Sequence, residues 1–210
     1  MIEKIKWIGV LLFLMGIIYG SHRLSAAVAA NLNPEREETR ITVVIDSGHG
    51  GEDPGKIGVN GALEKDINLA IGKMLKETLG KENIQVVLTR ETDEMLADSK
   101  TEDMKNRVKI MNEAKPVLVV SVHQNSYVTE QESGAQVFYY THSEKGKALA
   151  LDLQENLKNL DAGNRREAKA NDTYYILRHT EVPTVIIECG FLSNREEAEK
   201  LTTEEYQQEL

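Results

Sequence analysis

The side chains of this 210-residue chain best suited to chemistry are two histidines and two glutamates: His49, Glu64, His123 and Glu188. Two imidazoles and one carboxylate form a common ligand set for catalytic zinc, with a fourth position left for water. His49 and His123 would supply the nitrogens, and the glutamates are alternatives for the carboxylate. The glycine-rich loop around His49 could instead bind an anion, but it lacks the Lys-Ser or Lys-Thr of a phosphate-binding loop.

The two glutamates occupy different kinds of position. Glu64 opens an expected helix, where the helix dipole stabilises an acid without any metal. Glu188 directly follows the apolar run Thr184–Ile187, where burying a carboxylate is costly unless it is paired or bound. Because a strand would hold it rigidly, Glu188 is the better candidate for a general base that moves a proton from zinc-bound water to the leaving amine. Such a base typically contributes about 100- to 10,000-fold.

Apolar runs alternating with amphipathic segments predict the elements that position these residues. Several runs are apolar throughout, which indicates a mostly parallel sheet covered on both faces, a three-layer α/β/α fold of about six strands. We expect strands at 42–45, 84–89, 117–122, 135–140 and 184–187, and helices at 64–80, 102–114, 143–160 and 195–201. Residues 174–177 suit either a strand or a helix, and 161–172 form a connection. Because carboxyl ends of parallel strands share one edge, His49, Arg90, His123 and Glu188 should converge there.

Composition excludes some classes of function. The formal net charge is −9, which disfavours nucleic acid as a partner because such binding depends on neutralising phosphates with Lys and Arg. The single cysteine, Cys189, excludes an intrachain disulfide, and this fits either a reducing compartment or an exported protein without bridges. Its side chain should point to the face opposite Glu188, as a buried thiol.

The first 30 residues predict export. The apolar run Trp7–Gly20 would span about 21 Å as a helix, short of a hydrocarbon core of about 30 Å. It therefore suits a signal peptide with a cleavage site near 27–29, or an N-terminal anchor that attaches residues 5–20 to a membrane. We expect a linker over 31–40, a catalytic domain over 41–210, and an extracytoplasmic location in the cell wall or spore cortex region.

Five segments together resemble the zinc-dependent N-acetylmuramoyl-L-alanine amidases of the type 3 amidase family, over about residues 41–210. They are D-S-G-H-G-G-E-D-P-G (46–55), L-E-K-D (63–66), L-T-R (88–90), S-V-H-Q-N-S (121–126) and I-I-E-C-G-F-L-S-N (186–194). The resemblance implies that His49, Glu64 and His123 bind Zn²⁺, that Glu188 is catalytic, and that the substrate is peptidoglycan. Ser47 departs from the family's usual proline, and the chain stops within an expected last helix that begins near 204.

Within that family, the single-domain build and the tract S-G-A-Q-V-F-Y-Y (133–140) look most like the germination-specific amidases of the spore cortex. That branch implies cleavage of the stem peptide from muramic acid on the way to muramic δ-lactam. The alternatives are a zinc peptidase acting within the stem peptide and a non-catalytic wall-binding module on the same fold. An accessory protein that orders the zinc site is compatible with the sequence.

Other polar residues are weaker candidates. Arg90 could bind a substrate carboxylate, but a structural role, such as pairing with the acidic neighbour Asp93 or Glu188, is favoured. Asn125 could bind substrate or hold its loop. His142 and His179 are expected at the surface. The remaining candidates are tyrosines that could stack on sugar but more often pack in a sheet, namely Tyr127, Tyr139, Tyr140, Tyr174 and Tyr175.

Overall fold

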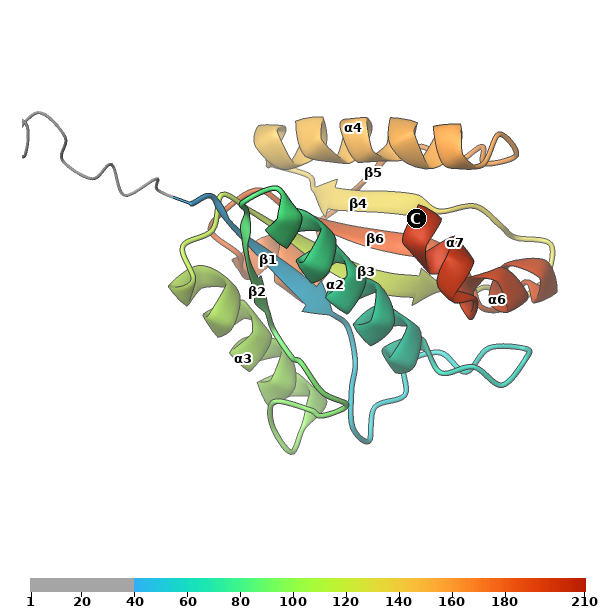
Figure 1. Ribbon diagram of the computed structural model, residues 1–210, viewed down its shortest axis with the longest axis horizontal. Helices are drawn as coiled ribbons and strands as arrows, with labels where there is room; N and C mark the ends of the chain where they lie inside the picture. Colours follow the sequence, from blue (N-terminus) through green and yellow to red (C-terminus); the bar gives the residue numbers. More distant parts are fainter. Residues whose placement is uncertain (1–39) are drawn as a thin grey trace, which may run out of the picture. The chain divides into compact units, whose positions relative to one another are not determined.

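The computed structural model describes residues 40–210, so the expected export segment and all but the last residue of the linker lie outside the described residues. A six-stranded sheet forms the centre, in the order β2-β1-β3-β6-β4-β5 (Figure 1). The strands are β1 (Thr42–Ser47), β2 (Gln85–Leu88), β3 (Leu118–Asn125), β4 (Gln136–Tyr140), β5 (Lys169–Asn171) and β6 (Thr184–Phe191). All neighbours are parallel except β4 and β6, which confirms the mostly parallel sheet expected from the apolar runs.

Residues 40–210 contain six helices, of which the first four connect strands and the last two follow β6. They are α2 (Glu64–Lys81), α3 (Lys100–Glu113), α4 (Glu144–Leu160), α5 (Tyr175–His179), α6 (Arg195–Leu201) and α7 (Glu204–Glu209). Serine residues cap the N-termini of two of these helices, α3 and α4. The hydroxyl of Ser99 accepts from the backbone N–H of Glu102, and that of Ser143 accepts from Gly146, so each satisfies a donor that the first helical turn leaves free.

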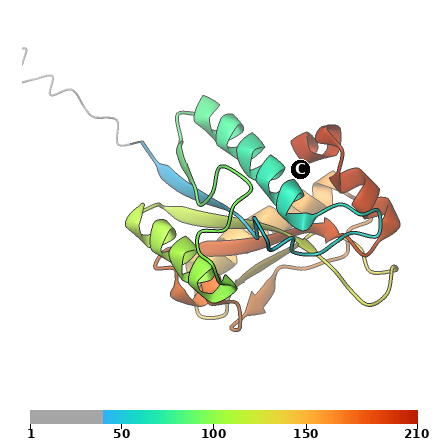
Figure 2. The same cartoon turned by 90° about the horizontal axis from the view of Figure 1, so that it is seen from below.

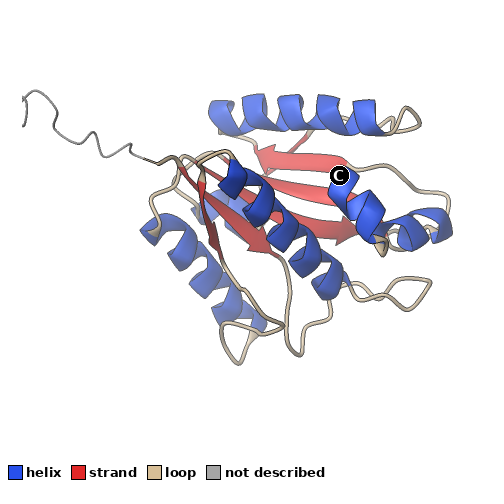
Figure 3. Cartoon of the chain, in the orientation of Figure 1, coloured by secondary structure: helices blue, strands red, loops and turns tan. Residues whose placement is uncertain are grey.

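The helices cover the two faces of the sheet unequally. Apolar side chains of α2, α4, α6 and α7 pack on one face, and those of α3 and α5 pack on the other. Figure 2 shows α2 and α3 on opposite sides of the sheet, and Figure 3 shows helices flanking the strands. The result is the three-layer arrangement expected when a parallel sheet needs covering on both faces.

One part of the first face is less covered. Between α2 and α4, apolar side chains such as Leu79, Val120 and Leu153 line a groove over the sheet, and α7 lies at one end of it. Within residues 40–210, no helix combines the length and the apolar character that crossing a membrane would demand.

The structure corrects several expected boundaries. We expected β3 and β6 to stop at the residues before His123 and Glu188, but β3 runs to Asn125 and β6 to Phe191, with an irregularity after His123. Polar residues can continue these strands because β3 and β6 pair through backbone hydrogen bonds, which do not depend on the type of side chain. The expected connection over 161–172 contains β5, and residues 174–177 belong mainly to α5. Helix α2 passes Gly80, and Asn83 takes the positive φ of 60° that follows its end.

Candidate active site

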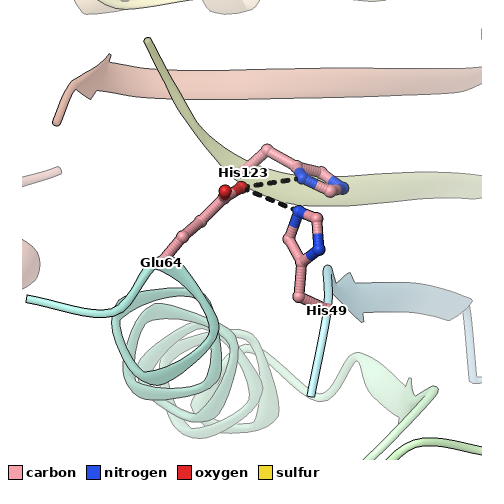
Figure 4. A group of neighbouring side chains, drawn as sticks. All are labelled: His49, Glu64 and His123. Carbon is pink, nitrogen blue, oxygen red and sulfur yellow. Dashed lines mark hydrogen bonds and ion pairs between the residues drawn. The ribbon is translucent and has the colours of Figure 1, made fainter. Parts of the chain in front are cut away.

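Three of the predicted residues meet at the carboxyl edge of the sheet (Figure 4). His49 follows β1, Glu64 is the first residue of α2, and His123 lies in β3. Oε1 of Glu64 lies 3.2 Å from Nε2 of His49 and 3.0 Å from Nδ1 of His123. One donor atom from each residue fits within 4.8 Å of the others. Segments 74 residues apart in sequence therefore present two nitrogens and one oxygen to a single point.

Glu64 is buried and firmly oriented. Its Oε2 accepts a hydrogen bond from the backbone N–H of Lys56 at 2.7 Å, and its Oε1 accepts one from Gln124 at 3.0 Å. Burial alone would raise its pKa, but the contacts with His123 and His49 hold the pKa of this carboxyl well below its usual range. Glu64 therefore stays ionised and can serve as an anionic ligand.

Two glycines leave the room that this arrangement needs. A Cβ at position 48 would overlap the imidazole of His123, and one at position 55 would collide with Glu64 and His49. His49 itself has φ of 63°, in the left-handed region that a non-glycine residue seldom adopts. Such a conformation persists only where surrounding contacts hold it, and it is often found at functional sites.

A buried ionic network lies beneath the His49 loop. Arg107 of α3 binds Asp46 at 2.8 Å and Asp103 at 2.6 Å, and its side chain is 2% exposed. The hydroxyls of Ser121 and Thr89 also donate to Asp46, at 2.6 Å each. Burial alone would raise the pKa of Asp46, but Arg107 and these hydroxyls lower it overall. The network is therefore a satisfied set of charges, which a buried ion pair needs.

Arg107 connects that network to the loop. Its guanidinium donates to the backbone oxygens of Ser47 at 2.8 Å and His49 at 2.6 Å. Arg90 adds hydrogen bonds to the same backbone, at 2.8 Å to Ser47 and 3.2 Å to Gly48. Two arginines therefore hold the strained loop by donating hydrogen bonds to its backbone carbonyl oxygens.

Arg90 also donates to the carbonyls of Lys65 and Thr92, and it is 2% exposed. Neither acidic neighbour expected for it forms an ion pair with it in residues 40–210, and Asp93 binds Lys65 instead. Arg90 does not line the hollow described below, so a role in binding substrate stays a prediction without a supporting contact. Its contacts are those of a residue that shapes the loop.

Glu188 lies beside His123. The two residues are register partners on the neighbouring parallel strands β3 and β6, so their side chains leave the same face about 4.8 Å apart along the sheet. Glu188 is 8% exposed, and its Oε2 is buried without a hydrogen-bond partner. Burial raises the pKa of this carboxyl, with the negative charge of Glu64 adding to the effect and the histidines opposing it. A buried carboxylate oxygen without a hydrogen-bond partner indicates an atom that is available to bind a ligand or to accept a proton.

All four residues line one hollow of about 340 Å³ on the α3 and α5 side of the sheet. Asn125 also lines it, as its predicted substrate contact requires, while its Oδ1 accepts from the backbone N–H of Ser126. The other walls come from β3, α3, α5 and β6, through Gln124, Met104, Tyr174, Tyr175, Ile176 and Ile186. The convergence expected from parallel strand ends is therefore confirmed for His49, His123 and Glu188, and Glu64 joins them.

The remaining candidates lie at the surface, in the packed interior or in the wall of the hollow. His142 and His179 are exposed, each against a tyrosine ring, as expected of surface residues. Cys189 is buried, and burial raises its pKa to about 12. Of the tyrosines, Tyr174 and Tyr175 line the hollow, and Tyr127 is 56% exposed away from it.

Sequence reasoning missed two residues of this site. Asp53 accepts from Nδ1 of His49 at 2.8 Å, and its position four residues after His49 in the same loop could have indicated this contact. Arg107 lies three residues after Met104 and four before Met111, so helical spacing could have placed it on the buried face of α3.

The residues present fit a zinc ion. Two imidazoles and a carboxylate are the donor types that catalytic zinc takes. A ligating histidine commonly donates its other ring N–H to a carboxylate, and Asp53 is placed to accept one from His49. The unpartnered oxygen of Glu188 lies in the same hollow, where a reacting water would need a base.

Comparisons with known proteins agree with this geometry. Residues 43–210 match the family model described as N-acetylmuramoyl-L-alanine amidase. The germination-specific N-acetylmuramoyl-L-alanine amidase of Bacillus subtilis (strain 168) is 31% identical, over 99% of this chain and 91% of its own length.

Solved structures are similar as well. The CwlD amidase from Clostridioides difficile, solved in complex with the GerS lipoprotein, is 39% identical with a TM-score of 0.78, over 81% of this chain and 92% of that one. The amidase AmiC2 of Nostoc punctiforme is 34% identical with a TM-score of 0.71, over 80% and 89% of the two chains. With motifs, fold and site in agreement, the chain belongs to the N-acetylmuramoyl-L-alanine amidase family.

Proposed function

We propose that this amidase cleaves the bond between N-acetylmuramic acid and L-alanine of peptidoglycan as a zinc enzyme, in the spore cortex, on the way to muramic δ-lactam. The observation that carries the zinc mechanism is the meeting of His49, Glu64 and His123, with Glu188 beside them in register. The cortex role is supported by the likeness to a germination-specific relative.

His49, Glu64 and His123 would hold the ion. When bound, zinc would polarise the scissile carbonyl and lower the pKa of a coordinated water to about 7. Glu188 would accept the proton of the attacking water on its free Oε2. The water oxygen bonds to the lactyl carbonyl carbon, the C–N bond breaks, and Glu188 returns its proton to the amine of L-alanine.

The environment of Glu188 suits this cycle. A general base works best when its pKa lies near the working pH, and burial moves the pKa of Glu188 upward, towards that range. Asn125, at the rim of the same hollow, is our candidate for a hydrogen bond to substrate. We assign Arg90 to holding the His49 loop because its donors already reach four backbone carbonyls.

Mass spectrometry of digested peptidoglycan tests the reaction. We expect free stem peptides that begin with L-alanine. Shortened stems still attached to sugar would instead establish the peptidase alternative, and binding without any cleavage would establish the wall-binding one.

Substitutions test the roles of the residues. Glu188→Gln should lower the rate about 100- to 10,000-fold while keeping zinc, because it removes only the base. The matched control is Glu199→Gln, an exposed residue on α6. His123→Ala should lose the zinc equivalent that the unaltered protein carries. Full hydrolysis by Glu188→Gln would refute its catalytic role.

We also propose export to the extracytoplasmic side, with membrane attachment through residues 5–20 or cleavage after them, and an accessory protein. A CwlD structure contains the GerS lipoprotein, which supports the accessory protein by analogy. Cell fractionation followed by N-terminal sequencing would separate attachment from cleavage. Zinc content measured with and without co-expressed lipoprotein would test the accessory role.

A further inference from the structure

We propose that Asp53 is a positioning residue, which fixes His49 in the tautomer and ring orientation that present Nε2 to the metal. The proposal rests on the zinc site proposed above. It assigns a role to a carboxylate that lies outside the four residues of the proposed mechanism.

The contacts of Asp53 hold it in place from several sides. Its Oδ2 lies 2.8 Å from Nδ1 of His49, and its Oδ1 accepts from Nζ of Lys100 at 2.7 Å and from the backbone N–H of Gly55 at 3.3 Å. The backbone of Asp53 forms two further hydrogen bonds with Gly50, both 3.0 Å long. The carboxylate, 13% exposed, is therefore held on the loop independently of His49.

These contacts determine which ring nitrogen faces the metal. An ionised carboxylate only accepts hydrogen bonds, so Asp53 requires a proton on Nδ1 of His49. Nε2 lies 3.2 Å from Glu64, and a metal bound there would take the place of any proton on that nitrogen. Asp53 thus selects the tautomer with which His49 can bind a metal alongside Glu64.

His49 needs such a partner more than His123 does. His123 lies within β3, where strand pairing and the close approach of Gly48 limit its ring. His49 lies on a loop, at φ of 63°, where no strand orients it. In residues 40–210, Glu64 is the only carboxylate paired with His123, whereas His49 contacts Glu64 and Asp53 on opposite ring nitrogens.

Zinc affinity of the full chain, measured by competition with a chelator, tests the role. Asp53→Ala should weaken zinc binding about 10- to 100-fold, as loss of such an outer carboxylate typically does. Asp53→Asn should recover most of that loss, because its side-chain oxygen still accepts from Nδ1–H. Glu52→Ala, the exposed neighbouring acid, should leave zinc affinity unchanged. Zinc affinity of Asp53→Ala equal to that of the unaltered chain would overturn the proposal.

Nitrogen chemical shifts of His49 in the zinc-free full chain provide a readout that does not depend on metal. We expect Nδ1 to carry a proton in the unaltered chain and in Asp53→Asn, and the proton to move to Nε2, which faces Glu64, in Asp53→Ala. The same tautomer in all three would refute the positioning role, even if zinc binds. Absence of zinc binding by the unaltered chain, with the tautomer shift intact, would instead refute the proposed zinc mechanism.

Discussion

The site has two halves that are held in different ways. The loop half, residues 48–55 with His49, has positive φ angles at His49, Gly50, Gly51 and Gly55. It depends on side chains that reach its backbone from α3 and from the loop after β2. The strand half, His123 and Glu188, is placed mainly by the register of β3 and β6. A strand positions a side chain through its ladder, whereas a strained loop must be held by specific polar contacts. Substitutions in the two halves should therefore have different consequences.

Removing Arg107 should have the largest effect, because it supports the loop half. Arg107→Ala would leave Asp46 and Asp103 with an uncompensated buried charge and free the carbonyls of Ser47 and His49. We expect a loss of about 3–5 kcal/mol in the free energy of unfolding, measured by urea denaturation. Lys105→Ala on the exposed side of the same helix is the control, and its ion pair with Glu102 should contribute little because solvent screens it. Equal losses would show that the network does not hold the loop.

Removing zinc should affect the halves unequally. A ligand that binds only the folded state stabilises it by about 2.7 kcal/mol at 100 times its dissociation constant, so a chelator should lower the melting temperature. Hydrogen exchange should increase in residues 48–55 and change little in residues 118–122, where the ladder to β1 and β6 persists. Equal increases in both segments would contradict the distinction between loop and strands.

Filling the space at Gly48 should disturb the contact between the halves. In Gly48→Ala, the new methyl group would overlap the imidazole of His123. Overpacking of this kind costs about 1–3 kcal/mol, and we expect weaker zinc binding in a chelator competition. Gly80→Ala, in α2, is the control, since a Cβ there meets nothing within 4 Å and should stabilise the helix by about 0.5–1 kcal/mol. Unchanged zinc affinity in Gly48→Ala would show that His123 can move without cost.

The smallest expected effect concerns Cys189, next to Glu188 on the strand half. Its pKa of about 12 leaves about one thiolate in 10,000 at pH 8. Since the thiol is also buried, iodoacetamide should not alkylate it in the folded protein, and should do so after denaturation in guanidinium. Rapid alkylation of the folded protein would mean that β6 opens readily, against our description of the strand half.

Sequence reasoning succeeded where a local pattern carries the information. Apolar runs predicted the principal strands, and helical spacing predicted the starts of α2, α3 and α4 within two residues. It was less successful at strand ends, because polar residues such as His123 and Glu188 interrupt the apolar pattern without ending the ladder. The short β5 was missed because three residues, Lys169–Asn171, carry too little pattern to distinguish a strand from a connection.

The sequence by itself determined the types of element, the mostly parallel sheet and the residues chemically able to hold a metal or move a proton. Residue type and periodicity suffice for that, because they report which side chains a strand or helix must bury. Only the tertiary structure decided that His123 and Glu188 are register partners, that Arg107 and Arg90 turn inward beneath the loop, and that Asp53 holds His49. These depend on which distant segments lie side by side, and local periodicity carries no information about that.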